Sequence, residues 1–382
     1  MSSPRRSACE VTIVAHDIGS VGGMERVLGE LILGLRALGH PVTVIARTCR
    51  LPADAGLRFH RVPGPARPVL LAYPWFLIAG SLMLWRRRRG VVQSTGAIVL
   101  GRVDVIAVHY LHQVGPVTPS RSTPLFRLHA RLVAALLRAG ERAIFAANRS
   151  AVFVGVSDGV AGELREHHPH VRGRVESIHN GVDVQAFAPQ QDRAGQRRRA
   201  RERFGIPQQR LVAVFVGSEW ERKGLEPAIR AIAAAPEWDL AVAGDGDREH
   251  YQRLADSLGV AHALHWLGVL EDVAPAYELA DAFVLPSSYE TFSLVTFEAA
   301  ASALPLLATP VNGVRELLRD GENGFTIGRD PEPIAARLRA LGADVALRER
   351  LGMRARESAL AFSWEAMVRK HHELYERLAP AS

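Results

Sequence analysis

The 382-residue sequence contains only two cysteines, Cys9 and Cys49. So few thiols exclude a fold built on disulfides and fit a reducing compartment, and we therefore expect a cytoplasmic protein. The first ten residues are polar, and the first apolar run, Val11 to Ala15, is too short for the core of a cleavable signal. Lysine is scarce as well: of the 47 lysine and arginine residues, only two are lysines, Lys223 and Lys370.

Acidic residues are scarce in the first half of the chain. Residues 1–185 contain 23 arginines and 12 acidic residues (23 − 12 = +11), whereas residues 186–382 contain 24 basic and 28 acidic residues (24 − 28 = −4). A basic half can face nucleic acid, an anionic membrane or a phosphorylated substrate. The chain lacks zinc-ligand spacing, RNP-like aromatic motifs and basic heptads, so we expect no nucleic-acid partner.

One segment approaches the length of a membrane span. Val69 to Trp85 comprises 17 mostly apolar residues, is interrupted by Pro74, and is followed by four arginines, Arg86 to Arg89. We favour a buried helix with a solvated basic end, because the run is at the lower limit of spanning length. The alternative is a peripheral membrane contact through Val69–Arg89, in which apolar side chains and arginines meet anionic headgroups. A transmembrane helix is the least favoured of the three.

Short apolar runs alternate with helical patterns along the whole chain, which predicts an α/β protein with parallel sheets. After the first run, apolar residues from Val27 to Leu38 recur at helical spacing and Gly39 ends the helix. The polar stretch Gln190 to Arg203 indicates a linker or surface excursion, and a second alternation begins after it. Strands are predicted at Val11–Ala15, Val42–Ala46, Val103–Val108, Val152–Val156, Leu211–Val216, Leu240–Ala243, Ala263–Leu267, Ala282–Leu285 and Leu306–Ala308. The boundaries predicted are 1–185 and 186–362, with a final helix in 363–382.

Two glycine turns link a predicted strand to a helix. Gly22 and Gly23 allow backbone N–H groups to approach an anion at the start of a helix, although a plain tight turn explains them too. The second turn runs from Gly244 to Asp247 and resembles a dinucleotide fingerprint without its third glycine. Its aspartates would repel a pyrophosphate, so we reject NAD binding there.

A rare lysine stands beside an arginine just after a predicted strand, in Gly217-Ser-Glu-Trp-Glu-Arg222-Lys223-Gly. The planar fork of Arg222 and the compact ammonium of Lys223 together suit two phosphate groups. A solvated pair of loop charges is the alternative.

Two glutamates occur in a segment that otherwise has the composition of a protein interior, Ser287 to Ala300. Ser293 is a plausible N-cap of a helix whose first N–H groups would face an anion. Glu298, one turn into this helix, could accept hydrogen bonds from vicinal hydroxyls, and Glu290 would lie near a sugar. On this hypothesis the two carboxylates pair with a ligand rather than with protein. Alternatively, Glu290 is solvated and Glu298 is bridged to an arginine.

The chain resembles retaining nucleotide-sugar glycosyltransferases of the GT-B fold, whose mark is a Glu-x7-Glu motif followed by an alanine-rich helix. Glu290 and Glu298 match that motif, and Gly22-Gly23-Met24-Glu25-Arg26 matches the family's amino-terminal glycine loop. Asn180-Gly-Val-Asp183 and Asp320-Gly-Glu-Asn-Gly324 match motifs nearer the domain junction and the carboxyl end. The resemblance covers nearly the whole chain. It implies two Rossmann-like doubly wound domains facing a central cleft, with the acceptor on the first domain and the donor on the second.

The resemblance also implies roles for individual residues. Arg222 and Lys223 would neutralise the diphosphate, Glu298 would hold the ribose hydroxyls, and Glu290 would contact the donor sugar. His109 resembles the family's histidine beside that sugar, although a lone histidine at a strand end is more often structural. The remaining donor contacts, mostly through backbone groups, are implied at Gly22, Gly23, Thr291, Phe292, Ser293, Leu294, Val269 and Leu270.

Two departures from the family pattern bear on the donor. Ser218 stands where many members have an arginine, so Arg222 must take over that work, as in the lipopolysaccharide-core glucosyltransferase branch that this pattern resembles. Thr291 and Ser293 stand where the family has glycines and would tighten the sugar pocket. These departures leave the donor sugar open.

The resemblance implies a retaining hexosyltransferase that uses a nucleotide diphosphate sugar, most readily a UDP-sugar. The acceptor would be a glycan, a lipid-linked compound or a small molecule, and a basic first domain suits an anionic one. The leaving diphosphate would help to deprotonate the acceptor, and basic residues would replace a divalent cation, so we expect neither metal nor cofactor. The alternatives are a sugar-nucleotide epimerase of the same fold, a non-catalytic sugar-nucleotide-binding protein and a peripheral membrane scaffold.

Overall fold

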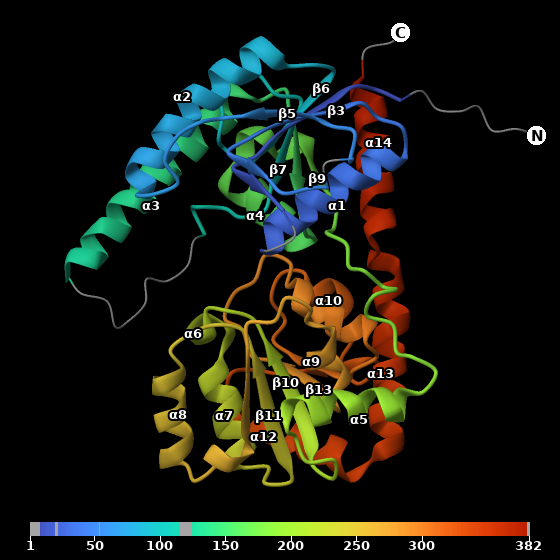
Figure 1. Cartoon of the computed structure of the whole chain (residues 1–382). Coiled ribbons are helices and arrows are strands. Elements are labelled where there is room, and N and C mark those ends of the chain that lie inside the picture. Colours follow the sequence, from blue (N-terminus) through green and yellow to red (C-terminus); the bar gives the residue numbers. More distant parts are fainter. Residues whose placement is uncertain (1–7, 20–21, 53, 115–123, 380–382) are drawn as a thin grey trace, which may run out of the picture. The chain divides into compact units, whose positions relative to one another are not determined.

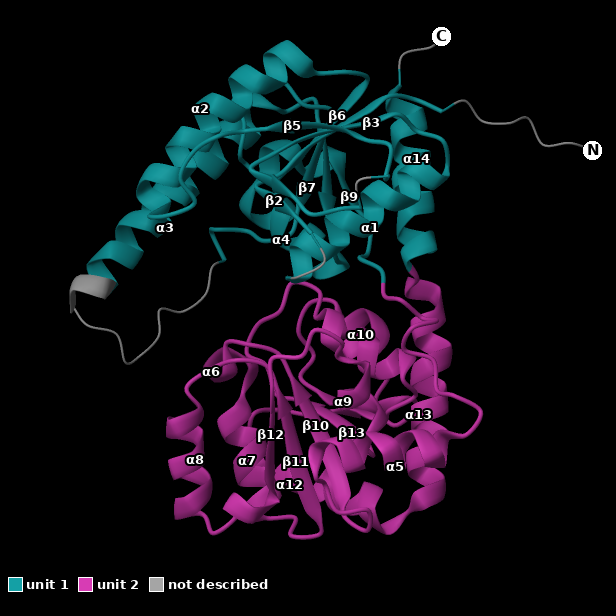
Figure 2. Cartoon of the chain, viewed as in Figure 1, with its two compact units in different colours: residues 1–181, 364–382 teal, residues 182–363 magenta. Residues whose placement is uncertain are grey.

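The structure, a computed structural model, describes residues 8–19, 22–52, 54–114 and 124–379. The chain divides into two compact units, coloured separately in Figure 2. Unit 1 comprises residues 1–181 and 364–382, and unit 2 comprises residues 182–363. The sequence prediction placed the first boundary at residue 185 and the second at residue 362.

Unit 1 is built on a seven-stranded parallel sheet of order β5-β3-β1-β6-β7-β8-β9 (Figure 1). Its strands are β1 (Val11–Val14), β3 (Val42–Ala46), β5 (Arg58–Arg61), β6 (Val91–Thr95), β7 (Val105–Val108), β8 (Val152–Gly155) and β9 (Val175–Ser177). Its helices are α1 (Gly23–Ala37), α2 (Val69–Arg87), α3 (Pro124–Ala147), α4 (Asp158–His167) and α14 (Trp364–Leu378). The central strands are buried along their whole length because helices cover both faces of a parallel sheet, and the polar Gln93 of β6 is buried with them. The strand order reverses between β1 and β6, which makes the sheet doubly wound.

The carboxyl-terminal helix α14 packs on unit 1 against α1. A Cβ at Gly34 of α1 would lie 2.4 Å from a methyl group of Val368, so the glycine permits the two helices to approach. The hydroxyl of Tyr375 donates to Oε1 of Gln93, in the central strand β6, at 2.7 Å. These buried contacts make α14 part of the core of unit 1 although it is separated from the rest by unit 2 in the sequence.

Unit 2 contains a six-stranded parallel sheet of order β12-β11-β10-β13-β14-β15. Its strands are β10 (Leu211–Val216), β11 (Trp238–Ala243), β12 (Leu264–Gly268), β13 (Ala282–Leu285), β14 (Leu306–Ala308) and β15 (Gly324–Thr326). Its helices are α5 (Arg193–Phe204), α6 (Trp220–Lys223), α7 (Leu225–Ala233), α8 (Arg248–Ser257), α9 (Ala274–Glu278), α10 (Leu294–Ala301), α11 (Val314–Leu317), α12 (Pro331–Ala343) and α13 (Val345–Ala359). The order reverses between β10 and β13. In doubly wound sheets, ligands bind beyond the carboxyl ends of the strands at such a switch point.

The polar stretch predicted as a linker or a surface excursion forms helix α5, so the prediction of a linker was wrong. Asp192 caps its first turn and Gly205 ends it in a left-handed conformation. Arg201 is buried because its guanidinium bonds to the carboxylate of Asp281 at 2.7 Å and to the carbonyl of Leu279. The arginines that make the stretch resemble a linker are therefore satisfied by partners about 80 residues away in the chain.

The apolar segment Val69–Trp85 forms helix α2, but the favoured prediction of a buried helix was wrong for one of its sides. Tyr73, Phe76 and Leu84 are buried in unit 1, whereas Leu71, Ile78 and Trp85 are largely exposed. Only 28% of its most apolar window is buried. Within the described residues, α2 is the one helix whose length and composition would allow it to cross a membrane.

Candidate active site

Helix α6, which carries Arg222 and Lys223, directly follows β10 through a strained turn. Gly217 has a φ of 131°, and a Cβ there would lie 2.6 Å from Cε of Lys223, so the glycine leaves room for the lysine stem. At the far end of α6, a Cβ at Gly224 would lie 2.2 Å from the carbonyl oxygen of Pro286, at the end of β13. Two glycines therefore hold the basic pair against the loop that follows the neighbouring strand.

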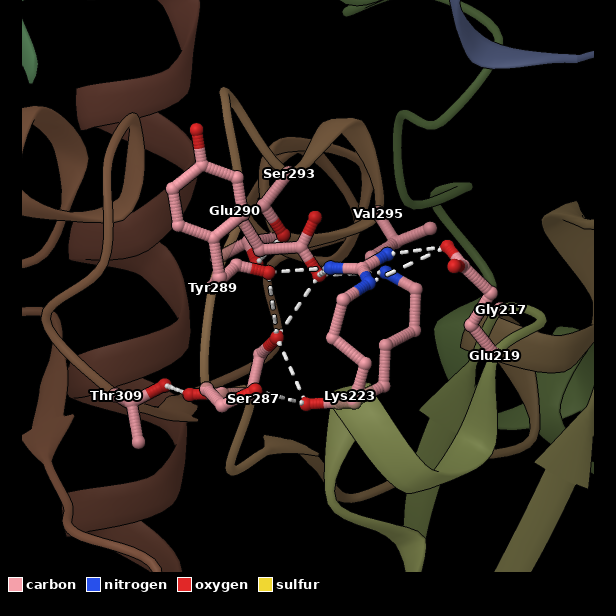
Figure 3. A network of polar contacts seen from close by, with 12 residues as sticks. Gly217, Glu219, Lys223, Ser287, Tyr289, Glu290, Ser293, Val295 and Thr309 are labelled. Atoms are coloured by element: carbon pink, nitrogen blue, oxygen red, sulfur yellow. Dashed lines mark hydrogen bonds and ion pairs between the residues drawn. The ribbon is translucent and has the colours of Figure 1, made fainter. Parts of the chain in front are cut away.

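The carboxylate of Glu290 is the point on which this basic pair converges (Figure 3). Nζ of Lys223 lies 2.8 Å and Nη1 of Arg222 lies 3.1 Å from the same oxygen, Oε1. The hydroxyl of Ser287 donates to that oxygen at 3.1 Å, and the Arg222 guanidinium also donates to the carbonyl of Tyr289. Glu290 is buried, so its compensation comes from these donors.

Burial would raise the pKa of Glu290, but the charges of Lys223 and Arg222 outweigh it, and the pKa lies below its usual value. For Arg222, burial would lower the pKa, whereas the carboxylates of Glu290 and Glu219 raise it above its usual range. Nη2 of Arg222 lies 2.8 Å from the mostly exposed carboxylate of Glu219. Glu290 and Arg222 therefore remain ionised near neutral pH.

The loop after β13 leads into helix α10 through Ser293, which has a φ of 67°. Ser293 occupies the N-cap position, as predicted, but no backbone N–H donates to its side chain. Its Oγ instead lies 2.8 Å from Oγ1 of Thr296. A Cβ at Gly313 would lie 2.0 Å from the carbonyl oxygen of Phe292, so this glycine supports the loop from behind. The side chain of Phe292 is buried and stacks on Phe297.

Glu298 lies one turn into α10 and is buried. Its Oε2 accepts a hydrogen bond of 2.8 Å from the hydroxyl of Tyr277, in α9. Both carboxylates thus have partners within the protein, and binding of a ligand by Glu290 and Glu298 stays a prediction. The alternative of a solvated Glu290 was wrong, because this side chain is buried. Both carboxylates are buried, and each needs donors from the protein to be stable there.

The remaining predicted residues occupy separate positions. Thr291 and Leu294 belong to the loop and first turn around Ser293, and Val269 and Leu270 follow β12, with Val269 strongly exposed. Gly22 is the N-cap of α1 with a φ of 93°, and Gly23 begins that helix in unit 1. A Cβ at Gly22 would lie 2.2 Å from the carboxylate of Glu25, so a side chain is disfavoured there.

His109 follows β7 in unit 1. Burial and the neighbouring His371 of α14 lower the pKa of His109 to about 4, so its imidazole is neutral at physiological pH. Burial likewise lowers the pKa of His371 to about 4, and its Nδ1 donates to the carbonyl of Met367. A neutral imidazole can donate one hydrogen bond and accept one, but it does not supply a charge.

Sequence reasoning missed three partners of the predicted residues: Ser287, Tyr277 and Glu219. Ser287 precedes Glu290 by three residues in an irregular loop, where no periodicity marks a contact. Tyr277 is 21 residues from Glu298. Glu219 is only three residues before Arg222 in the sequence. Its backbone has a left-handed φ of 57°, which the sequence did not indicate, and its carboxylate bonds to Arg222.

Comparison with known proteins identifies the family. A profile described as Glycosyltransferase Family 4 matches residues 21–186, and one described as Glycosyl transferases group 1 matches residues 210–344. The D-inositol 3-phosphate glycosyltransferase of Streptomyces avermitilis is 30% identical over 397 residues, covering 94% of this chain and 83% of that protein. The protein of the same name from Thermomonospora curvata is 31% identical, with 94% and 91% covered. For the relative from Corynebacterium jeikeium, 34% identical, the match spans about half of both proteins, 57% of this chain and 55% of that one. The chain belongs to this glycosyltransferase family and is a transferase.

Solved structures agree on the fold. WaaG, a glycosyltransferase involved in lipopolysaccharide biosynthesis, aligns with a TM-score of 0.80 and 22% identity over 96% of this chain and 99% of that chain. The sucrose-phosphate synthase of Thermosynechococcus elongatus aligns with a TM-score of 0.76 and 22% identity over 97% and 99%. The HepE protein of Anabaena, solved in complex with UDP and glucose, aligns at 0.72 and 16% over 96% and 99%. The predicted α/β fold of GT-B type, with two Rossmann-like domains, is confirmed.

Proposed function

We propose that the protein is a retaining hexosyltransferase that uses a nucleotide diphosphate sugar, most readily a UDP-sugar. The observation that carries the proposal is the convergence of Arg222 and Lys223 on Glu290 beside the start of α10, at the switch point of the unit 2 sheet. Two cations and a helix N-terminus at one edge suit a diphosphate. The description of HepE with UDP and glucose supports uridine diphosphate as the donor's leaving group.

In this proposal, each part of the donor meets a different group of residues. Arg222 and Lys223 bind the phosphate oxygens, and the first backbone N–H groups of α10 add their dipole. The carboxylate of Glu298, held by the hydroxyl of Tyr277, accepts hydrogen bonds from the ribose hydroxyls. Glu290 and the backbone of 291–294 contact the sugar, and the segment of Val269 and Leu270 contacts the base. For His109, Gly22 and Gly23 of unit 1, the roles that the family resemblance implies stay predictions.

The proposed transfer breaks the bond between the anomeric carbon and the diphosphate oxygen and forms a bond from that carbon to the acceptor oxygen on the same face. The acceptor's proton passes to the leaving diphosphate. Negative charge grows on the diphosphate as the bond breaks, and the protein accelerates the step by holding fixed cations there. Because Arg222 and Lys223 supply this charge, we propose that the reaction needs no divalent metal. Full activity in the presence of EDTA is the expected result.

For the acceptor, we propose an anionic compound, either a phosphorylated small molecule or a glycan or lipid that carries phosphate. The excess of arginine in residues 1–185 supports this class, and the relatives named D-inositol 3-phosphate glycosyltransferases suggest a phosphorylated acceptor. We place the reaction in the cytoplasm, because the chain has two cysteines and both are free thiols.

A thermal shift experiment tests the donor proposal directly. UDP, GDP, ADP and CMP are compared on the wild type, on Glu298→Ala and on Glu278→Ala, whose carboxylate in α9 accepts instead from Gln196. A ligand at one hundred times its dissociation constant adds about 2.7 kcal/mol of stability. We expect UDP to stabilise the wild type and Glu278→Ala but not Glu298→Ala. Absence of stabilisation by all four nucleotides would refute the donor site.

Turnover separates the transferase from its rivals. With a UDP-hexose and no acceptor, we expect NMR to show the sugar nucleotide unchanged apart from slow hydrolysis. Interconversion of the hexose would instead identify an epimerase. Binding of UDP with no turnover on any phosphorylated polyol, glycan or lipid acceptor would identify a non-catalytic binding protein.

A further inference from the structure

Helix α2 of unit 1 carries a stripe of large apolar side chains that the rest of the unit does not cover. Its members recur at alternating intervals of four and three residues, which places them on one side of the helix. Their exposed fractions range from 47% for Leu82 to 75% for Trp85. The stripe consists of Leu71, Trp75, Ile78, Leu82 and Trp85. The fifteen residues from Leu71 to Trp85 extend over about 21 Å of helix, which makes this a continuous apolar strip.

Helix α3 lies beside α2 and also exposes large apolar side chains (Figure 1 shows the two helices). The two helices touch at Gly140, where a Cβ would lie 2.2 Å from the hydroxyl of Tyr73. Leu128 and Leu132 of α3 are each more than half exposed. The α2–α3 face is the name used here for the stripe of α2, these two leucines and the exposed arginines Arg86 to Arg89, Arg127, Arg131 and Arg138.

The exposed charged side chains of α2 and α3 have one sign. Arg86 to Arg89 at the end of α2 are exposed, as are Arg127, Arg131 and Arg138 of α3. Helix α2 contains no acidic residue, and the only one in α3, Glu141, is buried and bonded to His112 and His168. Within the described part of the chain, Arg86 to Arg89 form no ion pair with a carboxylate. Their charge is therefore left for an external anion.

We propose that the α2–α3 face is a docking surface for a lipid bilayer with anionic headgroups. Apolar side chains flanked by arginines, with tryptophans between them, match the boundary between acyl chains and phosphates. Trp75 illustrates the fit, because its Nε1 donates to the carbonyl of Pro63 at 2.6 Å while half of the side chain remains exposed. The stripe would lie in the plane of the interface, and the arginines would contact lipid phosphates.

The helix lies on the membrane rather than across it. Its other side is part of the core of unit 1, where Tyr73 donates to the carbonyl of Ala97 at 2.8 Å and Phe76 packs edge-on against His16. Ser81 accepts a hydrogen bond of 2.8 Å from the backbone of Leu100. Insertion across a bilayer would break all of these contacts. Nucleic acid suits the arginines but not the apolar stripe, and a second copy of the chain would bring arginines with no acidic partner on this face.

The test is flotation of the full-length protein with vesicles of phosphatidylcholine, alone or mixed with phosphatidylglycerol. We expect binding to the mixed vesicles only, weakening as salt is added. Changing Arg86, Arg87, Arg88 and Arg89 together to glutamine is expected to weaken binding about tenfold or more. The matched control changes Arg198, Arg203, Arg253 and Arg350, four exposed arginines of unit 2, and keeps the same net charge. The control is expected to bind within about twofold of the wild type.

A second readout tests the apolar stripe. Brominated lipids are expected to quench tryptophan fluorescence of the wild type, with much of the quenching lost in Trp85→Phe. The triple variant Leu71→Ser, Ile78→Ser, Leu82→Ser changes only exposed side chains and is expected to abolish flotation while keeping the wild-type circular dichroism.

Three outcomes would overturn the proposal. They are equal binding to both vesicle types, equal loss of binding in the unit 2 control, and no binding by the wild type. If the wild type proved to be a dimer that the triple serine variant dissociates, the face would belong to a second copy of the chain. None of these measurements depends on sugar transfer, so this proposal and the proposed function can fail independently.

Discussion

In unit 2, Arg222 and Lys223 share the buried carboxylate of Glu290, whereas the arginines at the end of α2 in unit 1 have no carboxylate partner in the described chain. The first arrangement fixes each charge in place through partners of the opposite sign. The second leaves positive charges in solvent beside exposed apolar side chains. Compensated charges belong to the architecture of a site, because removing one leaves another buried and unpaired. Uncompensated charges cost little to fold and are available to an anion from outside.

Removal of Lys223 breaks the compensated arrangement and is expected to have the largest effect. In Lys223→Ala, Glu290 keeps Arg222 but loses the donor at 2.8 Å, and the proposed diphosphate loses one of its two cations. We expect kcat/KM for a UDP-hexose to fall about 10²- to 10³-fold, the usual effect of removing one preorganised charge-stabilising group. The chain provides its own control, because its only other lysine, Lys370, is exposed on α14. Activity of Lys223→Ala within twofold of Lys370→Ala would contradict the assignment.

Protonation of Glu290 at acidic pH should remove its ion pairs with Lys223 and Arg222. The folded-state pKa of Glu290 lies below its ordinary value of 4.5, so the unfolded chain binds its proton first as the pH falls. The stability that the carboxylate contributes is therefore present above pH 4.5 and is lost as the pH falls through the folded-state pKa. We expect the difference in urea midpoint between the wild type and Glu290→Gln to shrink below pH 4.5. A constant difference down to acidic pH would contradict the compensated pair.

Histidines in unit 1 contribute to the same titration with a different window. The pKa values of His16, His109 and His371 are lowered from 6.5 to about 4 by burial. These side chains are neutral in the folded protein and become protonated on unfolding, so stability is lost between pH 6.5 and about 4. This loss is the same in the wild type and in Glu290→Gln, and it cancels in the difference between them.

Arg222 has a second carboxylate partner, the exposed Glu219. It bonds to Arg222 from the solvent side and would compete with a phosphate for the same guanidinium. Because Glu219 is 65% exposed, the expected effect is small: Glu219→Gln should lower the dissociation constant of UDP about two- to fivefold. The control is Glu226→Gln, which breaks a similar exposed pair with Arg230 in α7. Weaker UDP binding, measured by calorimetry, would show that Glu219 positions Arg222 instead.

The smallest effect is expected for folding of the variant in which Arg86 to Arg89 are glutamine. These side chains are exposed and have no carboxylate partner in the described chain, so the urea midpoint should correspond to a change within about 0.5 kcal/mol. The same experiment on Lys223→Ala is expected to show clear destabilisation. A loss of more than about 1 kcal/mol in the arginine variant would show that these charges support the fold.

Much of the fold could be predicted because strands such as β7 and β13 are buried on both sides and appear as short apolar runs. Strands β5 and β6 carry several polar residues and were not predicted. The prediction was wrong where the environment of a segment in the fold differs from what its local composition indicates. Helix α5 has the composition of a linker, but Asp281 neutralises Arg201 and allows it to be buried. Helix α2 has the composition of an interior helix, but hydropathy records how apolar a segment is and does not record whether another element covers it.

The candidate site shows the same limit. Arg222, Lys223, Glu290 and Glu298 could be selected from residue types and spacing, because charges in apolar surroundings require a reason. Their partners Tyr277 and Ser287 could not, since nothing in their local sequence indicates a contact. Whether Glu290 would be solvated, ligand-bound or paired with protein was equally beyond the local pattern.

Residue type and local spacing are sufficient to predict the α/β class and to find the motif residues of the glycosyltransferase family. They also give the unequal distribution of arginine and acidic residues between the two halves of the chain. Only the tertiary structure decided which charges are compensated. Lys223 and Glu290 are 67 residues apart in the chain. They meet because β10 and β13 pair in parallel, with Ala213 opposite Ala282, so the segments that follow both strands emerge at the same edge of the sheet. The arginines after α2 precede β6, which pairs with β1, but the carboxylate just before β1, that of Glu10, bonds to Arg58 instead.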